Sequence, residues 1–338
     1  MADSITLSRV GATEGKTPEN HEEARQLFLK QYSGEVLTAF DETNVALDRS
    51  VVREISEGKS AQFPTIAKAD AWYHKAGERI DGQKIKHDER VLYIDDLLLS
   101  ATHVYQLDEA MSHFDVRGEY STQQGRALAR TADKHLFQVG VNAARKSESE
   151  SPSGFPGGGE VVLGDAYDPD DIVKAMYQAA AILDKKDVPE GDRFFFCPPE
   201  VYYTAVLSDK AINRDFTSGN GDIATGSITE IAGIQLVKTN HLPAGQKIEE
   251  APRKGPQNGA NDYSGDFTDT LGLVWHRNAV GTVRLLDLAM EMEYQTEHQA
   301  TLMVAKYAMG HGVLRPDCAV EVKGEVKPIF DGETSDDA

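Results

Sequence analysis

Cysteine and long apolar runs are scarce in this chain, and each scarcity excludes a class of protein. The only cysteines, Cys197 and Cys318, lie far apart and match no metal-ligand spacing. They predict free, buried thiols in a reducing compartment. No run approaches the roughly 18 apolar residues that a membrane span needs. The opening MADSITLSRV has neither the basic nor the apolar part of a signal peptide, which predicts synthesis and folding in the cytosol.

Positive charge is also in short supply. The chain carries 35 Lys and Arg against 55 Asp and Glu, a formal net charge of −20. Because affinity for DNA comes largely from Lys and Arg that displace counterions, this balance excludes a protein whose main task is to grip nucleic acid. Simple solubility explains the acidity equally well. With 40% hydrophobic and 27% charged residues, the 338-residue chain is expected to fold as one large domain or two modest ones.

Complete catalytic motifs are absent as well. The GKS at residues 58–60 ends like a phosphate-binding loop, but Arg53 stands where the first glycine of that motif belongs. Residues 219–224 fit a relaxed dinucleotide fingerprint, yet a loop precedes them and a strand is expected to follow, whereas the motif opens a helix. Neither segment predicts a nucleotide site.

Acidic and histidine-containing segments are equally unconvincing as sites. DAYDPDD at 165–171 lacks the glycine and the distal glutamate of a calcium loop, and helix capping by Asp168 accounts for it. The ten histidines form no His-Glu-x-x-His motif, and His276 and His311 are expected to be ordinary hydrogen-bonded residues. The sequence therefore predicts no catalytic residue, no cofactor and no metal. An α/β enzyme with a non-contiguous site remains the alternative, and a binding or decoration protein is a third possibility.

What the sequence does contain is a set of clear helical patterns. Apolar spacings of three and four predict one or two short helices between Pro18 and Phe40. Residues 107–146 hold no proline and predict a long helix, in which Gly118 and Gly125 allow close packing or a kink. Asp168–Pro169 predicts the start of another helix over 169–187, and a further helix is expected at about 200–209.

Strand and loop patterns fill the rest of the chain. Residues 59–96 predict a long, charged β-hairpin with its turn at Asp81–Gly82. Further strands are expected in DRFFFCPP, in ITEIAGIQLVKT as a pair or a bulged strand, and in three runs of the last third. By composition, 147–160 is a flexible linker, and 213–227 and 244–268 are loops. Because an isolated two-stranded ribbon is marginal in water, the hairpin must lie against a core or a neighbouring subunit.

Five segments of the chain carry a resemblance to a known family. They are GEVLTAF (34–40), SEGKSAQFP (56–64), MSHFDVRGEYS (111–121), HRNAVGTVRLLDLAME (276–291) and AKYAMGHGVLRP (305–316). In order and spacing they resemble the major capsid proteins of short-tailed, autographivirus-type bacteriophages, which have the Hong Kong 97-type fold. The resemblance spans about residues 30–320, whereas 147–168 and 210–265 show no clear match.

The resemblance implies an α+β fold with the parts of a tailed-phage capsid subunit. These parts would be an N-terminal arm (1–57), an extended β-hairpin E-loop (58–98), a peripheral domain (99–164 and 266–330) with the spine helix 107–146, an α/β axial domain (165–265) and a disordered acidic tail (331–338). The hairpin would then lie across an adjacent subunit.

The implied function is self-assembly into the pentamers and hexamers of an icosahedral head around double-stranded DNA, without sequence-specific DNA binding and without a membrane. The chain would be assembled in the host cytoplasm and end in the virion. Arm-like sequence begins within about 20 residues, so a separate scaffolding protein is expected, with a portal at one vertex and possible decoration proteins. No covalent crosslink is predicted. Candidate contact residues between subunits are Phe63, Trp72, Tyr73, Arg79, Lys84, Lys86, Arg90, Arg117 and Arg126.

Overall fold

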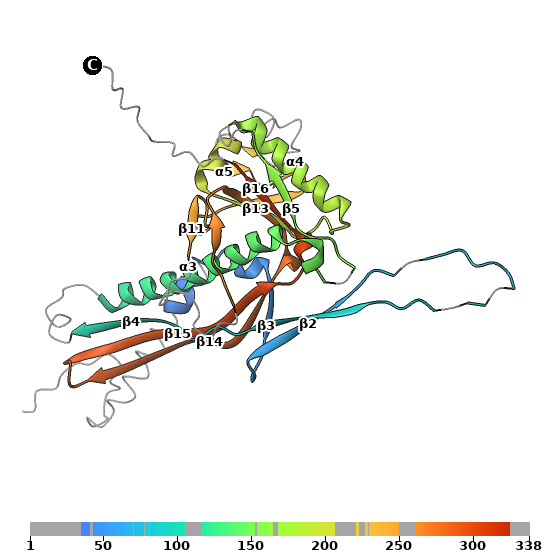
Figure 1. The fold of residues 1–338 in the computed structure, drawn as a ribbon. Helices are drawn as coiled ribbons and strands as arrows, with labels where there is room; N and C mark the ends of the chain where they lie inside the picture. The colour runs from blue at the N-terminus through green and yellow to red at the C-terminus, as the bar shows by residue number, and fades with distance from the viewer. Residues whose placement is uncertain are drawn as a thin grey trace, which may run out of the picture. The chain divides into compact units, whose positions relative to one another are not determined.

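A computed structural model describes most of the chain between residues 35 and 324. The described residues are 35–40, 43–69, 71–77, 79–80, 82–105, 116–152, 154–164, 168–206, 221–222, 227–228, 230–249 and 261–324. The chain divides into two compact units. The first comprises residues up to Asn44, Leu97–Thr131 and Leu286–Ala308, and the second comprises Val45–Asp96, Ala132–Leu285 and the residues from Met309. Figure 1 shows the elements of both units.

The second unit is built on a six-stranded mixed sheet in the order β5-β16-β13-β6-β10-β9. β13 runs antiparallel to both of its neighbours, β6 and β16, whereas β6 pairs with β10 and β16 with β5 in parallel. The strands are β5 (Gly159–Val162), β6 (Arg193–Cys197), β9 (Glu230–Ile231), β10 (Ile234–Lys238), β13 (Thr270–His276) and β16 (Ala319–Lys323). The predicted strand in DRFFFCPP and the predicted pair in ITEIAGIQLVKT are confirmed as β6 and as β9 with β10.

The core of this unit gathers around β13, whose seven residues are all buried. The Trp275 ring lies 4.6 Å from that of Phe196 and 5.6 Å from that of Phe137, measured between centroids. Gly140 makes this packing possible, because a Cβ there would lie 2.7 Å from both Leu273 and Trp275. Aromatic clusters of this kind bury large apolar areas and dominate the stability of a core.

Two helices in the second unit begin where the sequence predicts. α4 (Pro169–Lys185) starts with Asp168 as its N-cap, whose side chain accepts a hydrogen bond from Asp170 N, and with proline at its first position. Its buried stripe is Ile172, Val173, Ala175, Met176, Ala179, Ala180 and Leu183. α5 (Pro199–Val206) follows β6; the rest of the helix predicted to residue 209 lies outside the described residues.

The long predicted helix is confirmed as α3 (Val116–Arg145), 30 residues without interruption. Its predicted start, residues 107–115, lies outside the described part of the chain. In the first unit Gly125 allows close packing, because a Cβ there would lie 2.5 Å from the carbonyl oxygen of Val36 in the helix at residues 35–40. The predicted helix between residues 18 and 34 is outside the described residues.

Two long strands accompany α3 in the first unit. β15 (Ala300–Val313) pairs antiparallel with β4 (Leu98–Tyr105), from Ala300 opposite Tyr105 to Tyr307 opposite Leu98. β14 (Val280–Gln295) begins in the second unit, where its first residues pair in parallel with β1 (Val51–Glu54). All three predicted strands of the last third, β13, β14 and β15, are thereby confirmed.

The predicted hairpin, called the ribbon below (Ser60–Tyr93), is paired only at its root. β2 (Ser60–Ile66) and β3 (His87–Tyr93) form a regular antiparallel ladder. Beyond Ala67, whose N–H donates to Lys86 O, no described residue up to 85 is in a strand, so the expected full-length hairpin is wrong there. A turn occurs at Ala76–Gly77, where Gly77 supplies a φ of +93° that favours glycine. Of the predicted Asp81–Gly82 turn, Asp81 lies outside the described residues.

Three segments predicted as linker or loop contain regular structure. β11 (Gln246–Ile248) pairs with β12 (Gly265–Phe267), so 244–268 is not all loop, and β7 (Gly221–Asp222) pairs with β8 (Ser227–Ile228). In 147–160, a 3₁₀ turn at Glu148–Glu150 carries a capping box from Ser147. Gly158 N also donates to Lys146 O at 2.8 Å. Composition does not predict these features. Glycine is common both in flexible linkers and where two backbone segments pack closely, so its abundance does not distinguish the two. The tail at 331–338 is outside the described residues.

Candidate functional site

The described part of the ribbon between residues 71 and 86 exposes large apolar side chains. Trp72 is 56% exposed, Ile80 72% and Tyr73 104%, which is full exposure. Two of these are aromatic residues, the type most strongly enriched at the centres of protein interfaces. Arg79, Lys84 and Lys86 on the same segment are exposed as well. This stretch is therefore an apolar and cationic surface displayed to solvent.

Side chains at the root of the ribbon already make contacts within their own chain. Phe63 and Arg90 are cross-strand partners, and the Arg53 guanidinium lies 5.8 Å from the centre of the Phe63 ring. The Arg90 guanidinium donates to the carbonyl oxygen of Glu150. An ion pair of 2.6 Å joins Lys68 to Asp187, and both side chains are more than half exposed. Of the predicted contact residues, Phe63 and Arg90 thus already have neighbours in the subunit.

The two predicted arginines on the spine helix do not share a face. Arg117 and Arg126 both lie in α3, and the Arg126 side chain is exposed. Their separation of nine residues corresponds to about 2.5 turns at 3.6 residues per turn, which puts the positions on opposite sides of the helix.

No catalytic arrangement emerges from the described residues. The GKS segment lies between β1 and β2, with Gly58 at a φ of +112°, and leads into a strand instead of a helix. Burial raises the pKa of the Cys318 thiol to about 12 and raises that of Cys197 as well, which keeps both protonated and unreactive. Across this part of the chain no group of three His, Cys, Asp or Glu could hold a metal ion. Nor is any helix there long and apolar enough to cross a membrane.

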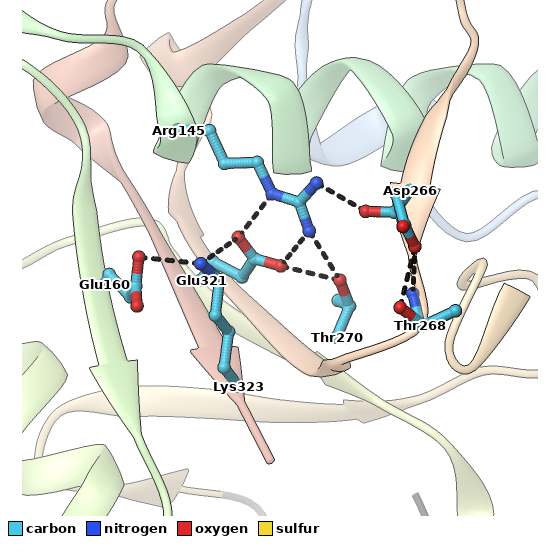
Figure 2. A network of polar contacts seen from close by, with 7 residues as sticks. All are labelled: Arg145, Glu160, Asp266, Thr268, Thr270, Glu321 and Lys323. Carbon is cyan, nitrogen blue, oxygen red and sulfur yellow. Dashed lines mark hydrogen bonds and ion pairs between the residues drawn. The ribbon is translucent and has the colours of Figure 1, made fainter. Parts of the chain in front are cut away.

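An extensive buried polar network lies in the second unit and has a structural role (Figure 2). Arg145, the last residue of α3, donates from Nε and Nη2 to the two carboxylate oxygens of Glu321 on β16, at 2.7 and 2.6 Å. The same Glu321 carboxylate accepts from Thr270 Oγ1 at 2.6 Å, and Arg145 also donates to the carbonyl oxygen of Asp266 in β12. Because the Glu321 side chain is fully buried, its charge depends on this bidentate partner.

The network ties three parts of the chain together. Hydrogen bonding to Glu321 raises the pKa of Arg145 above its usual value, so the guanidinium stays charged. At the rim, Lys323 Nζ lies 2.7 Å from Glu160 on β5. Arg145 and Glu321 form a pair that the sequence does not predict. The two are 176 positions apart, and no local signal connects them.

Structural comparison defines the class of protein. The capsid structure of the cyanophage P-SCSP1u matches with a TM-score of 0.74 and 39% sequence identity, covering 95% of this chain and 99% of that one. The mature capsid of bacteriophage PhiM1 matches with a TM-score of 0.68 at 20% identity, covering 84% of this chain and 88% of that one, and shows the same fold. The fold is that of tailed-phage capsid subunits, as the resemblance implies.

The sequence places the chain within this class. It belongs to the Gp10A-like major capsid protein family, whose profile matches residues 62–323. The major capsid protein of Escherichia phage T7 is 36% identical over 97% of this chain and all of the relative, and that of Enterobacteria phage T3 is 37% identical over 94% and 97%. The chain is therefore a structural major capsid protein of the phage virion. Because the matching family is structural, the comparisons favour this reading over the alternative of an α/β enzyme with a non-contiguous site.

Proposed function

We propose that this chain builds the pentamers and hexamers of an icosahedral head that encloses double-stranded DNA, and that its ribbon binds a neighbouring subunit. Membership of a major capsid protein family supports the first part. The observation that carries the second is the exposure of Trp72, Tyr73 and Ile80 on a segment that pairs with no strand among the described residues.

Each contact of the ribbon is modest and becomes strong by repetition. Burying one large apolar side chain contributes about 1.5–3 kcal/mol. A specific protein interface buries on the order of 1,000 Å² or more. Because every subunit holds several neighbours at once, the second and later contacts form at high effective concentration. A shell can thus be stable although each pairwise contact is weak.

The candidate contact residues divide into three roles under this proposal. Trp72 and Tyr73 are the apolar anchors, and Arg79, Lys84 and Lys86 supply positive charge that matches a subunit of net charge −20. Phe63 and Arg90 support the root of the ribbon. The remaining candidates are the two arginines of α3, Arg117 and Arg126, which would serve separate contacts because they lie on opposite sides of the helix.

The division of the chain into capsid parts is also proposed. In this scheme 1–57 is the arm, 58–98 the E-loop, 99–164 with 266–330 the peripheral domain, and 165–265 the axial domain. The six-stranded sheet draws strands from both the axial and the peripheral ranges. The scheme is thus a division by role in the shell, separate from the two compact units.

A deletion tests the role of the ribbon. Residues 71–84 are replaced by Asn-Gly, which keeps the β2–β3 ladder and the Ala67–Lys86 hydrogen bond. The expected product is a soluble, folded subunit that forms no shells with scaffolding protein, as seen by sedimentation and negative-stain electron microscopy. Regular icosahedral particles from this variant would refute the role.

Scaffolding protein, portal and decoration proteins are the partners that the resemblance to tailed-phage capsid proteins supports. Sedimentation of the purified chain with and without scaffolding protein tests the first of them. Rings or very large particles are expected only, or far more efficiently, when it is present. Equal yields of regular shells without it would remove scaffolding from the proposal.

The acidic charge supports enclosure of DNA without tight binding. We expect purified shells to retain no free duplex at about 0.15 M salt, where the screening length is about 8 Å. Retention of duplex by the shells in a filter or gel-shift assay would contradict the proposal.

A further inference from the structure

The root of the ribbon is held by a small, partly buried polar cluster that the proposed function does not use. Directly after β3, the Asp95 carboxyl accepts from Tyr263 Oη at 2.6 Å and from Asn261 Nδ2 at 2.5 Å. Asn261 also donates to Tyr93 O at 2.9 Å, and Asp95 N donates to Met309 O on β15 at 3.0 Å. The cluster thus joins the end of the ribbon to β15 and to the segment before β12.

Glycines on β15 let the root of the ribbon approach this closely. A Cβ on Gly310 would collide with the carbonyl oxygen of Tyr93, and one on Gly312 would collide with the Leu92 side chain. The strand therefore presents bare backbone where the ribbon leaves the sheet. This close approach of the two segments buries few side chains. The hydrogen bonds of the polar cluster therefore provide much of what holds the root of the ribbon there.

The Asp95 carboxyl has only neutral hydrogen-bond donors in this cluster. Within the described residues no lysine or arginine pairs with it, and the one charge that shifts its pKa is that of its neighbour Asp96, which raises it. The Tyr263 ring stacks on His135 of α3 at 4.4 Å, and its hydroxyl accepts from His311 N at 3.1 Å. Lys134, next to His135, adds positive charge on the helix side. His311 in turn shares a hydrogen bond of 3.0 Å with Thr282.

We propose that Asp95, Asn261 and Tyr263 form a clasp that holds the root of the ribbon on β15 and opens when the Asp95 carboxyl becomes ionised. A buried carboxylate without a cation is costly, whereas the neutral acid keeps its hydrogen bonds and can itself donate one. Opening lets water reach the carboxylate and frees the ribbon to change direction. The clasp is a property of the single subunit; only its consequence for assembly rests on the proposed function.

The direction of the pH effect follows from the charges around the clasp. Burial, partly offset by the hydrogen bonds from Asn261 and Tyr263 and reinforced by Asp96, raises the pKa of Asp95 from 3.8 to about 6. The stability that Asp95 contributes is therefore present at low pH and lost as the pH rises through about 6. Burial lowers the pKa of His135 from 6.5 to about 4 and that of His311 to about 3, so the stability that they contribute is full above about pH 6.5 and is lost as the pH falls through those lower values. Of these three groups, only Asp95 changes charge in the folded subunit between pH 5 and pH 8.

Hydrogen exchange of the purified, unassembled full-length chain tests this directly. The reporters are the Asp95 amide, which donates to Met309 O, and the Ile94 amide, which donates to Lys59 O. After correction for the intrinsic pH dependence of exchange, protection is expected to fall between pH 5 and pH 8 by about 10-fold. The limit over the whole titration, from below pH 3.8 to above pH 6, is on the order of 100-fold, set by the difference between a pKa of 3.8 and one of about 6.

Two variants separate the clasp from a general loss of structure. Asp95→Asn removes the titrating group and should make protection equal at both pH values. Asp96→Asn changes the exposed neighbour and should retain most of the difference. Equal protection of the unaltered chain at both pH values, or an undiminished pH dependence in Asp95→Asn, would overturn the proposal. Because no shell is involved, failure here leaves the proposed role of the ribbon between subunits unaffected.

Discussion

Trp72 and Trp275, the only tryptophans of this chain, lie in opposite environments. Trp275 is 1% exposed and packs against Phe137 and Phe196 under the helix residue Gly140, whereas Trp72 is 56% exposed on the ribbon. The first is stabilised entirely by its own subunit. The second has a large apolar area that its own subunit leaves exposed, which supports the proposed contact with another copy.

The comparison teaches how one chain can be both a stable subunit and an assembly component. The free energy of folding comes from the sheet core and its buried polar network. The exposed side chains of residues 71–86 should contribute little to that free energy, so under the proposed function this segment can remain exposed until a neighbouring subunit covers it. Substitutions in the two regions should therefore separate stability from assembly.

The largest effect on stability is expected in the core. Trp275→Ala should lower the free energy of unfolding by about 3–5 kcal/mol, because it leaves a cavity among Phe137, Phe196 and Leu273. Urea denaturation of the unassembled chain measures it. Within the described residues the indole N–H has no hydrogen-bond acceptor, so the matched control Trp275→Phe should cost less than half as much. A loss below about 1 kcal/mol for Trp275→Ala would contradict this account of the core.

The buried network should rank next. Arg145→Met leaves the buried Glu321 carboxylate with the hydrogen bond from Thr270 and with Lys323 Nζ at 3.9 Å, and should cost about 3 kcal/mol in the same assay. Lys323→Met removes the ion pair with the half-exposed Glu160 and the longer one with Glu321, leaves the bidentate Arg145 in place, and should cost at most about 1 kcal/mol. Similar losses for the two variants would show that the network does not depend on the charge of Arg145.

A pair of glycines provides a smaller and more local comparison. Gly140→Ala places a methyl group 2.7 Å from Leu273 and Trp275 and should destabilise the subunit by about 1–3 kcal/mol. Gly82→Ala on the ribbon meets no atom within 4 Å and should leave the free energy of unfolding nearly unchanged. Equal effects would mean that Gly140 is not tightly packed.

The smallest effect on stability should accompany the loss of shells. Trp72→Ala combined with Tyr73→Ala should change the free energy of unfolding by less than about 0.5 kcal/mol, because both side chains are exposed in the subunit. Association should weaken by at least about 10-fold for each contact, the equivalent of 1.4 kcal/mol. Light scattering during scaffold-assisted assembly measures this, and normal assembly kinetics would be incompatible with the proposed anchors.

The parts of the fold that the sequence predicts are those determined by neighbouring residues. The start of α4 follows from Asp168 and Pro169, and the length of α3 follows from its unbroken helical pattern. The ribbon itself is predicted, whereas the turn at Ala76–Gly77, where Gly77 has a positive φ, is not.

The parts that escape prediction depend on contacts between distant residues. Glu321 lies 176 positions from Arg145 in the sequence. Asn261 lies 166 positions from Asp95. At such separations no local sequence pattern predicts either pair. β11 and β12 are short and polar and gain their pairing only when the chain returns between residues 246 and 267. Among the contact residues, Trp72 and Tyr73 can be proposed from the sequence because a two-stranded ribbon has no interior in which to bury them. No local sequence pattern identifies the residues of another copy that they would contact.

The most direct test of the account compares solvent access at the two tryptophans before and after assembly. Hydroxyl-radical footprinting with mass spectrometry measures oxidation of Trp72, with buried Trp275 as the internal reference. The ribbon contact predicts rapid oxidation of Trp72 in the free subunit and strong protection in the assembled shell, while Trp275 is protected in both. Equal oxidation of Trp72 in subunit and shell would contradict the claim that another copy covers the ribbon.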